Sequence, residues 1–192
     1  MTTVETKREM RRRILAARRA MPEAERAAAG PALRDALAEV PLLTTGGTVA
    51  LYYSVGTEPD TRKLLAALWK HGTYVLLPVL LPGGELDWAA YEGPDSLAPA
   101  GRGLVEPLGR RYGTDALRRA AAVLCPALAV DGAGRRLGRG AGCYDRALAH
   151  VGPHTLTLAV IYDTELVAEV PAEPHDRAVD GVVTPGRGLL RF

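Results

Sequence analysis

Short apolar runs alternate with amphipathic stretches along most of this chain. Runs rich in β-branched and aromatic residues predict buried strands, because they are too short to be core helices. Stretches with apolar residues every three or four positions predict helices. Strands are expected at Thr48–Tyr53, Tyr74–Pro78, Leu86–Tyr91, Ala121–Val130, Thr155–Tyr162 and Val179–Thr184, and helices at Val4–Ala20, from Pro22 onward with a kink at Pro31, and at Thr61–His71, Ala116–Ala121 and Tyr144–Val151.

This alternation of strands and helices favours an α/β fold. We expect a three-layer, open and mainly parallel sheet with helices on both faces, of the Rossmann-like kind. The first helix is expected to turn Met10, Ile14, Leu15 and Ala17 toward the protein. The segment from 94 to 113 is rich in glycine and proline and predicts loop, and the tail after Pro185 is expected to be irregular.

Length and composition fit one globular domain spanning residues 1–192. With 47% hydrophobic and 24% charged residues, the composition is that of a soluble protein, and a net charge of +2 does not by itself indicate nucleic-acid binding. No apolar run approaches the length of a membrane span, and the N-terminus lacks the apolar region of a signal peptide. The only cysteines, Cys125 and Cys143, suggest neither a disulfide framework nor a CxxC metal site. These features favour a cytoplasmic protein that binds no membrane. We further expect no nucleic-acid partner and a monomeric state, although the composition does not determine the oligomeric state.

The most distinctive stretch is Asp131–Arg146, which reads DGAGRRLGRGAGCYDR and holds five glycines and four arginines. It lies between a predicted strand and a predicted helix. Glycines let the backbone approach a ligand, and N–H groups at such a loop and at a helix start bind anions. Arginine side chains would add positive charge. The stretch therefore predicts a phosphate site, with a solvated surface loop as the alternative.

Standard catalytic and phosphate motifs are missing from the chain. The loop fits neither GxxxxGK[ST] nor GxGxxG, neither serine lies in GxSxG, and no histidine pair has zinc-binding spacing. Mg²⁺ is usually held by one or two carboxylates together with substrate phosphates. Asp145, directly after the glycines, is the best candidate ligand, and Asp176 or Asp180 offers a second carboxylate. Residue chemistry alone thus predicts a nucleotide-phosphate site with Mg²⁺.

Two further groups have open interpretations. Lys7 and Arg11 lie one helical turn apart and would either bind phosphate or form a solvated basic face. Glu58 follows a predicted strand, where open α/β sheets place ligand groups, although it could instead cap the next helix.

The stretch Gly134–Leu148 resembles the G-x-RLG-x-G-x-G-x-YDR-x-L signature of 5-formyltetrahydrofolate cyclo-ligases. Other segments resemble that family in the same order along the chain. They are Lys7 with Arg11, YYSVGTEPDT from Tyr52, LVEP from Leu104, and VPAEPHDRAVDGVVT from Val170. Three positions depart from the family pattern: Ala141 replaces a frequent glycine, Cys143 a usual aromatic residue, and Arg102 a Trp that some members have.

The resemblance implies an ATP- and Mg²⁺-dependent ligase that converts 5-formyltetrahydrofolate, possibly polyglutamylated, to 5,10-methenyltetrahydrofolate. Arg136, Tyr144 and Asp145 would be catalytic, Tyr53, Glu58 and Tyr144 would bind the folate, and Asp145 and Asp176 would hold the metal. ATP would contact Lys7, Arg11, Gly134, Arg135, Arg136, Leu137, Gly138, Arg139, Gly140, Ala141 and Gly142.

Two alternatives remain open from the sequence. The same fold could serve a sugar-phosphate isomerase or a CoA-transferase-like enzyme, because fold does not determine function. A protein of another class could bind RNA through the basic N-terminal helix, with an affinity that falls steeply with salt.

Overall fold

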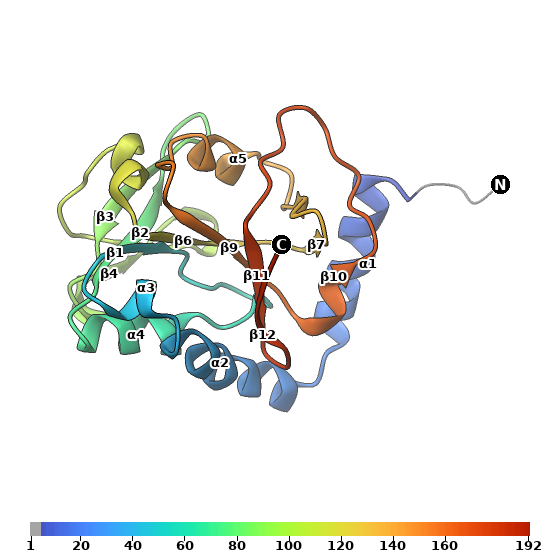
Figure 1. Cartoon of the computed structure of the whole chain (residues 1–192), viewed down its shortest axis with the longest axis horizontal. Coiled ribbons are helices and arrows are strands. Elements are labelled where there is room, and N and C mark those ends of the chain that lie inside the picture. The colour runs from blue at the N-terminus through green and yellow to red at the C-terminus, as the bar shows by residue number, and fades with distance from the viewer. Residues whose placement is uncertain (1–4) are drawn as a thin grey trace.

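The structure is a computed structural model that describes residues 5–192, and its centre is a seven-stranded sheet (Figure 1). The strand order is β12-β11-β9-β6-β1-β2-β3. The inner pairs are parallel, whereas β3 and β12 close the two edges as antiparallel strands. The expected open, mainly parallel sheet is therefore confirmed. The strands are β1 (Thr48–Leu51), β2 (Tyr74–Leu80), β3 (Leu86–Ala90), β6 (Ala122–Pro126), β9 (Leu156–Val160), β11 (Gly181–Thr184) and β12 (Gly188–Arg191).

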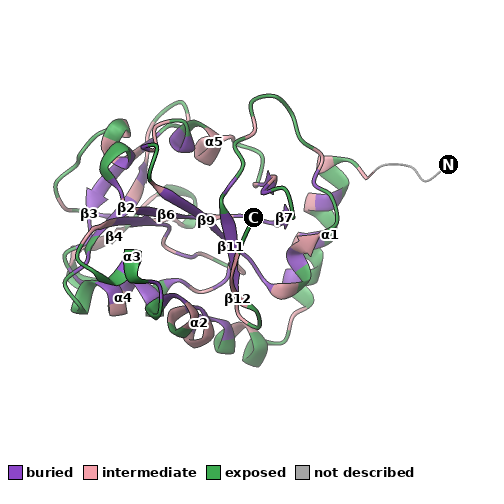
Figure 2. Ribbon diagram, in the orientation of Figure 1, coloured by how far each residue is buried: buried purple, intermediate pink, exposed green. Residues whose placement is uncertain are grey.

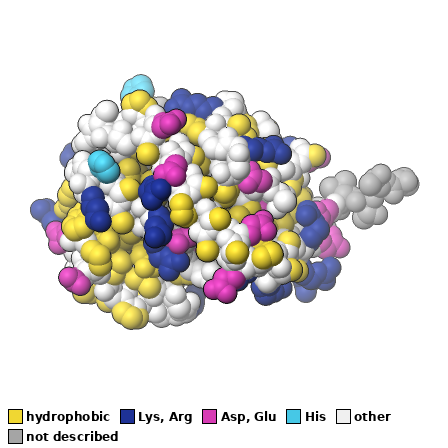
Figure 3. Space-filling model, turned by 90° about the horizontal axis from the view of Figure 1, so that it is seen from below, with side chains coloured by type: hydrophobic (Ala, Val, Ile, Leu, Met, Phe, Trp, Pro, Cys, Tyr) yellow, Lys and Arg dark blue, Asp and Glu magenta, His cyan; other side chains and the backbone are white. Residues whose placement is uncertain are grey.

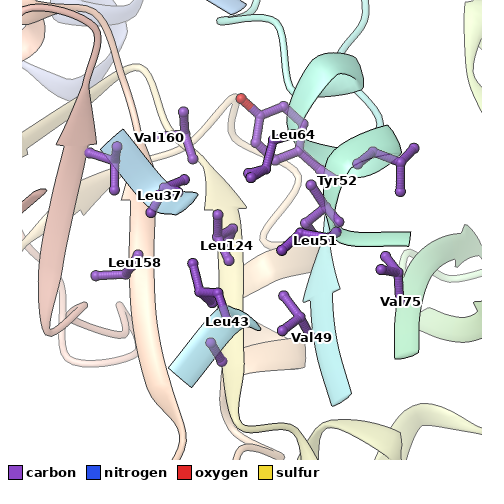
Figure 4. Packing of buried hydrophobic residues seen from close by; sticks show 14 of the residues in the cluster. Leu37, Leu43, Val49, Leu51, Tyr52, Leu64, Val75, Leu124, Leu158 and Val160 are labelled. Carbon is purple, nitrogen blue, oxygen red and sulfur yellow. The ribbon is translucent and has the colours of Figure 1, made fainter. Parts of the chain in front are cut away.

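One face of this sheet is covered by α2 (Glu23–Ala38), α3 (Pro41–Thr44) and α4 (Arg62–Lys70). Leu37, Leu43 and Leu64 come from these three helices and point at strand residues such as Leu124 (Figure 4). Burying a leucine side chain fully contributes about 1.5–3 kcal/mol, so these contacts stabilise the packing of the three helices on the sheet. The helix α2 continues through Pro31.

The opposite face is covered by shorter elements, the helix α5 (Cys143–Leu148) and the 3₁₀ helix η3 (Thr114–Arg119). Leu117 and Leu148 pack there with the fully buried Trp88. The central strands are buried while the outer sides of the helices are exposed, as Figure 2 shows. The predicted helices on both faces are thus confirmed.

The helix α1 (Lys7–Ala20) lies apart from the main layers, against a small sheet of β7 (Ala129–Asp131), β8 (Arg136–Leu137) and β10 (Leu166–Val167). Thr6 caps it in a capping box with Glu9, which fixes its start. The predicted start at Val4 lies outside the described residues. Met10 and Ile14 are buried as expected. The expectation for Ala17 was wrong, because Ala17 is exposed and Arg18 is buried in its place.

Three other expectations needed correction. The apolar run 121–130 is two strands, β6 in the main sheet and β7 in the small one. The C-terminal tail forms β12, which pairs antiparallel with β11. The segment 94–113 contains the hairpin of β4 (Leu97–Pro99) and β5 (Val105–Pro107), with short 3₁₀ turns η1 (Pro94–Ser96) before it and η2 (Gly101–Gly103) at its tip.

The face seen from below in Figure 3 mixes basic, acidic and hydrophobic side chains, without one sign of charge covering it. Among the described residues, no helix is both long enough and apolar enough to cross a lipid bilayer.

Candidate active site

A cavity of about 500 Å³ lies at the carboxyl ends of the parallel strands β1, β2 and β6. The chain leaves β1 for β2 on one side and later returns to β6 on the other, so the strand order reverses here. Open α/β sheets bind ligands at such a point. The cavity is lined by 30 residues, among them Lys7, Arg11, Tyr53, Glu58, Arg102, Glu106, the stretch Arg136–Asp145, Glu173, His175 and Asp176.

The loop Gly138–Gly142 joins β8 to α5 and forms one wall of the cavity. Gly140 and Gly142 have φ values of 109° and 67°, which only glycine adopts without strain. Within residues 5–192, no acceptor takes a hydrogen bond from the five backbone N–H groups of this loop. Arg11 donates from Nε to the Gly138 carbonyl oxygen at 2.9 Å and so places α1 beside the loop. N–H groups without protein acceptors, with an arginine next to them, are suited to binding an anion.

Arg136 and Asp145 form an ion pair behind this loop, with 2.7 Å between Nη2 and Oδ1. The Arg136 side chain is only 2% exposed, and its Nε has no hydrogen-bond partner among the described residues. The same Asp145 oxygen accepts the Arg177 N–H at 3.2 Å. The positive charge of a guanidinium in the cavity wall can stabilise a negative charge placed in the cavity.

Lys7 forms a second charged group with Glu173 and Asp176, at 2.6 Å from Nζ to each carboxylate. Burial raises the pKa of Asp176, but hydrogen bonds from Lys7 and from the Glu173 N–H outweigh it and hold that pKa below its usual 3.8. His175 lies close by, with 3.7 Å between Nε2 and Asp176 Oδ1. The helix α1 is thereby tied to the segment that approaches the last parallel strand.

Glu58 and Tyr144 face the same cavity. Glu58 accepts the Val55 N–H at 3.0 Å and pairs with Arg139 at 3.2 Å. Tyr144 packs edge-on against Trp88, and its buried hydroxyl has no partner in the described chain. Burial raises the pKa of Tyr144 well above its usual 10.0, so the hydroxyl keeps its proton and can donate a hydrogen bond.

The structure brings together most of the residues singled out in the sequence. Lys7, Arg11, Tyr53, Glu58, Asp176 and Arg136–Asp145 all line the cavity. Gly134 and Arg135 do not: Gly134 turns the β7–β8 hairpin, and Arg135 pairs with Asp131 at 2.6 Å. Their predicted contact with ATP has no support from this geometry.

Sequence reasoning missed Arg18, Glu106 and Glu173 as cavity residues. Arg18 is 1% exposed and pairs with the equally buried Glu165 at 2.6 Å. Arg18 lies seven residues after Arg11 and eleven after Lys7, on the same face of the helix, and this spacing was the signal that could have found it. Glu106 lies in the β4–β5 hairpin, within the segment 94–113 that was predicted to be a loop from its glycine and proline content.

Comparison with known proteins decides the family. The model of the 5-formyltetrahydrofolate cyclo-ligase family matches residues 3–185. The chain belongs to the 5-formyltetrahydrofolate cyclo-ligase family. It is 42% identical to the 5-formyltetrahydrofolate cyclo-ligase of Mycolicibacterium smegmatis over 190 residues, which cover 96% of each chain. The Escherichia coli K12 cyclo-ligase is 31% identical, over 88% of this chain and 95% of its own.

Solved structures agree with this family. The NMR structure of Aquifex aeolicus 5,10-methenyltetrahydrofolate synthetase superimposes with a TM-score of 0.83 and 28% identity, covering 96% of this chain and 92% of that one. The synthetase of Mycoplasma pneumoniae gives a TM-score of 0.73 at 18% identity, covering 93% of this chain and 98% of that one, which shows the shared fold.

Proposed function

We propose that this protein catalyses the ATP-dependent conversion of 5-formyltetrahydrofolate to 5,10-methenyltetrahydrofolate, with release of ADP and phosphate. The observation that carries the proposal is one cavity in which the loop Gly138–Gly142, whose N–H groups have no protein acceptor in the described chain, meets a carboxylate, Glu58, and the aromatic side chain of Tyr144. The family and the relatives named above support it. The isomerase, transferase and RNA-binding alternatives find no support in these comparisons.

The phosphates of ATP would lie against the loop Gly138–Gly142. Its unused N–H groups suit phosphate oxygens, and Arg11 and Lys7 on α1 face the same loop region. Arg136, which is held by Asp145 in the cavity wall, would add positive charge beside the transferring phosphoryl group. Phosphoryl transfer depends mainly on position and on stabilising the charge of the transition state, which these groups provide.

The folate ring would lie in the same cavity, near Glu58, Tyr53 and Tyr144. A carboxylate suits the N–H donors of a pterin, and Glu58 is held in place by the Val55 N–H. Tyr144 would line the ring with its aromatic side chain, which packs edge-on against Trp88.

Mg²⁺ would be held by Asp145 and Asp176 together with the phosphates. The donor set fits, because Asp145 makes both of its protein contacts through Oδ1, which leaves Oδ2 for the ion. Asp176 is kept ionised by its lowered pKa and shares its surroundings with Glu173 and His175. A bound Mg²⁺ would neutralise part of the negative charge of the phosphates. Lys7 and Arg136 partly neutralise these carboxylates without it.

The chemistry explains why ATP is needed. A formyl oxygen is a poor leaving group, so it first takes the γ-phosphoryl group of ATP, and ADP leaves. N10 of the folate then attacks the activated formyl carbon, the bond from that carbon to the phosphorylated oxygen breaks, and N10 loses its proton. Phosphate departs and the five-membered ring is closed. We propose that the enzyme works as a cytoplasmic monomer on this small-molecule substrate.

The decisive experiment mixes the purified protein with 5-formyltetrahydrofolate, Mg²⁺ and ATP. The ultraviolet absorbance of the methenyl product should rise, with one ADP released per product. Folded protein that gives no ATP-dependent rise would overturn the proposal.

The metal assignment is tested by Asp145→Asn. Turnover should fall about 100-fold or more, because a ligand that balances transition-state charge is lost. The amide oxygen can still accept from Arg136, so the free energy of unfolding should drop by only about 1–3 kcal/mol. Asp115→Asn is the matched control, since Asp115 pairs with His150 outside the cavity. Full turnover by Asp145→Asn across a Mg²⁺ titration would assign Asp145 a structural role only.

A further inference from the structure

Most charged side chains of the cavity wall are matched by opposite charge on the protein itself. Six lysines and arginines line the cavity, and four of them form ion pairs with carboxylates. Within the range 5–192, Arg11 and Arg102 make no ion pair. The paired cations are Lys7, Arg18, Arg136 and Arg139.

The two arginines without an ion pair lie on different elements. Arg11 is on α1 beside the glycine loop, where a phosphate would meet it. Arg102 is on η2, at the tip of the β4–β5 hairpin, and its side chain is exposed at the cavity rim. An anion at the glycine loop accounts for Arg11 and leaves Arg102 without a partner. The ligand of this cavity is therefore expected to carry a second negative group.

The backbone at Arg102 is strained. Its φ of 63° and ψ of 25° place it in the left-handed region, and it is the only non-glycine residue with positive φ in the part of the chain described. For a residue with a side chain this conformation is unfavourable. Gly101 and Gly103 flank it and would adopt such a conformation without strain. Strained positions of this kind cluster at ligand clamps, where the side chain is needed in one direction.

The hairpin that carries Arg102 is anchored at its base. Glu106 on β5 accepts the Leu80 N–H at the end of β2, at 2.9 Å. The tip closes with the Ala100 N–H donating to the Leu104 carbonyl oxygen at 2.8 Å. The guanidinium is thus presented from a fixed support and not from a free loop.

We propose that Arg102 binds a carboxylate of the glutamate tail of the folate substrate and determines specificity for that tail. This inference rests on the proposed function. The substrate has an uncharged ring system at one end and two carboxylates at the other, so an open cation at the rim matches the end that carries the charge. A guanidinium binds a carboxylate through paired, charge-assisted hydrogen bonds.

The test compares two substrates in the same assay: 5-formyltetrahydrofolate and its diamide, in which both tail carboxylates are neutral. Arg102→Gln should raise KM for the normal substrate about tenfold, the effect of one charge-assisted contact, and leave KM for the diamide and kcat for both nearly unchanged. Arg102→Lys should recover part of the loss. Arg187→Gln removes an exposed arginine outside the cavity and controls for net charge.

A second variant separates binding from folding. Arg102→Gly should be at least as heat-stable as the wild type, because glycine adopts positive φ without strain, and it should show the same selective rise in KM. If wild-type enzyme is active but Arg102→Gln and Arg187→Gln give equal KM ratios for the two substrates, this inference is refuted and the proposed function stands. If folded wild-type protein forms no product, both fail together.

Discussion

The buried ion pair between Arg18 and Glu165 gives the sharpest stability prediction. Arg18 donates to both Glu165 oxygens at 2.6 and 2.8 Å, and also to the Ala127 carbonyl oxygen at 2.7 Å. The guanidinium lies over the Tyr162 ring, 5.5 Å from its centroid. Arg18→Met removes all of these contacts and leaves the Glu165 carboxylate buried without its cation.

Breaking a buried pair from one side costs about 3–5 kcal/mol, a large part of the roughly 5–15 kcal/mol that stabilises a folded domain. At about 2–4 °C per kcal/mol for a chain of this size, the melting temperature should fall by about 6–20 °C. The double variant Arg18→Met, Glu165→Met buries no charge. It should recover much of the loss, because a packed apolar pair avoids the desolvation penalty.

Urea unfolding followed by circular dichroism at fixed pH measures these differences, and equal m-values would show that all variants unfold from comparable native states. A loss below about 1 kcal/mol in Arg18→Met would mean that the pair is solvated and not buried. If the double variant is no more stable than Arg18→Met, the unpaired Glu165 carboxylate does not cause the loss, and the loss comes from the packing of the Arg18 side chain alone.

Further predictions concern the β7–β8 hairpin and the folate end of the cavity. Gly134→Ala should destabilise the fold by about 1–3 kcal/mol, since φ is 75° and a Cβ would overlap the Val179 carbonyl oxygen, whereas Gly132→Ala, with open space, should be near neutral in thermal melts. Burial raises the pKa of Asp131, but hydrogen bonds from the Val170 and Ala133 N–H groups outweigh it and hold that pKa below 3.8. The ionised carboxylate therefore stabilises the folded protein fully above pH 3.8, and this stabilisation is lost as the pH falls further. Asp131→Asn should flatten the acid side of the plot of unfolding free energy against pH. Glu58→Gln should raise KM for the folate about tenfold with KM for ATP unchanged; an equal rise in both would contradict its place at the folate end.

Much of the main sheet could be predicted because its strands are short, apolar and bounded by glycine or proline. The run 121–130 shows the limit: hydropathy is uniform along it, yet the chain leaves one sheet at Pro126 and enters another at Ala129. The edge strand β12 was missed because it is only four residues long and follows a glycine-rich turn. Its partner strand, β11, sets its conformation, and local sequence does not show that pairing.

The site could be predicted where local sequence and chemistry coincide, as at Gly138–Gly142. Gly134 and Arg135 belong to the same glycine- and arginine-rich stretch, but they lie in the β7–β8 hairpin and outside the cavity lining. Only the hairpin geometry reveals this. Arg18 was not singled out, because arginines are mostly exposed. Its partner, Glu165, lies 147 residues along the chain, so no local pattern marks it as buried.

The position of α1 has a consequence for how the protein is made. This helix carries Lys7 and Arg11 at the start of the chain, yet its Arg18 contacts lie 109 and 147 residues downstream. On the ribosome, the helix therefore emerges long before the segments that cover its apolar and basic face. Until then this amphipathic, positively charged helix is exposed to chaperones and proteases. The cavity is complete only once Glu173, His175 and Asp176 have been made, so a shorter chain should not bind the ligand of this cavity.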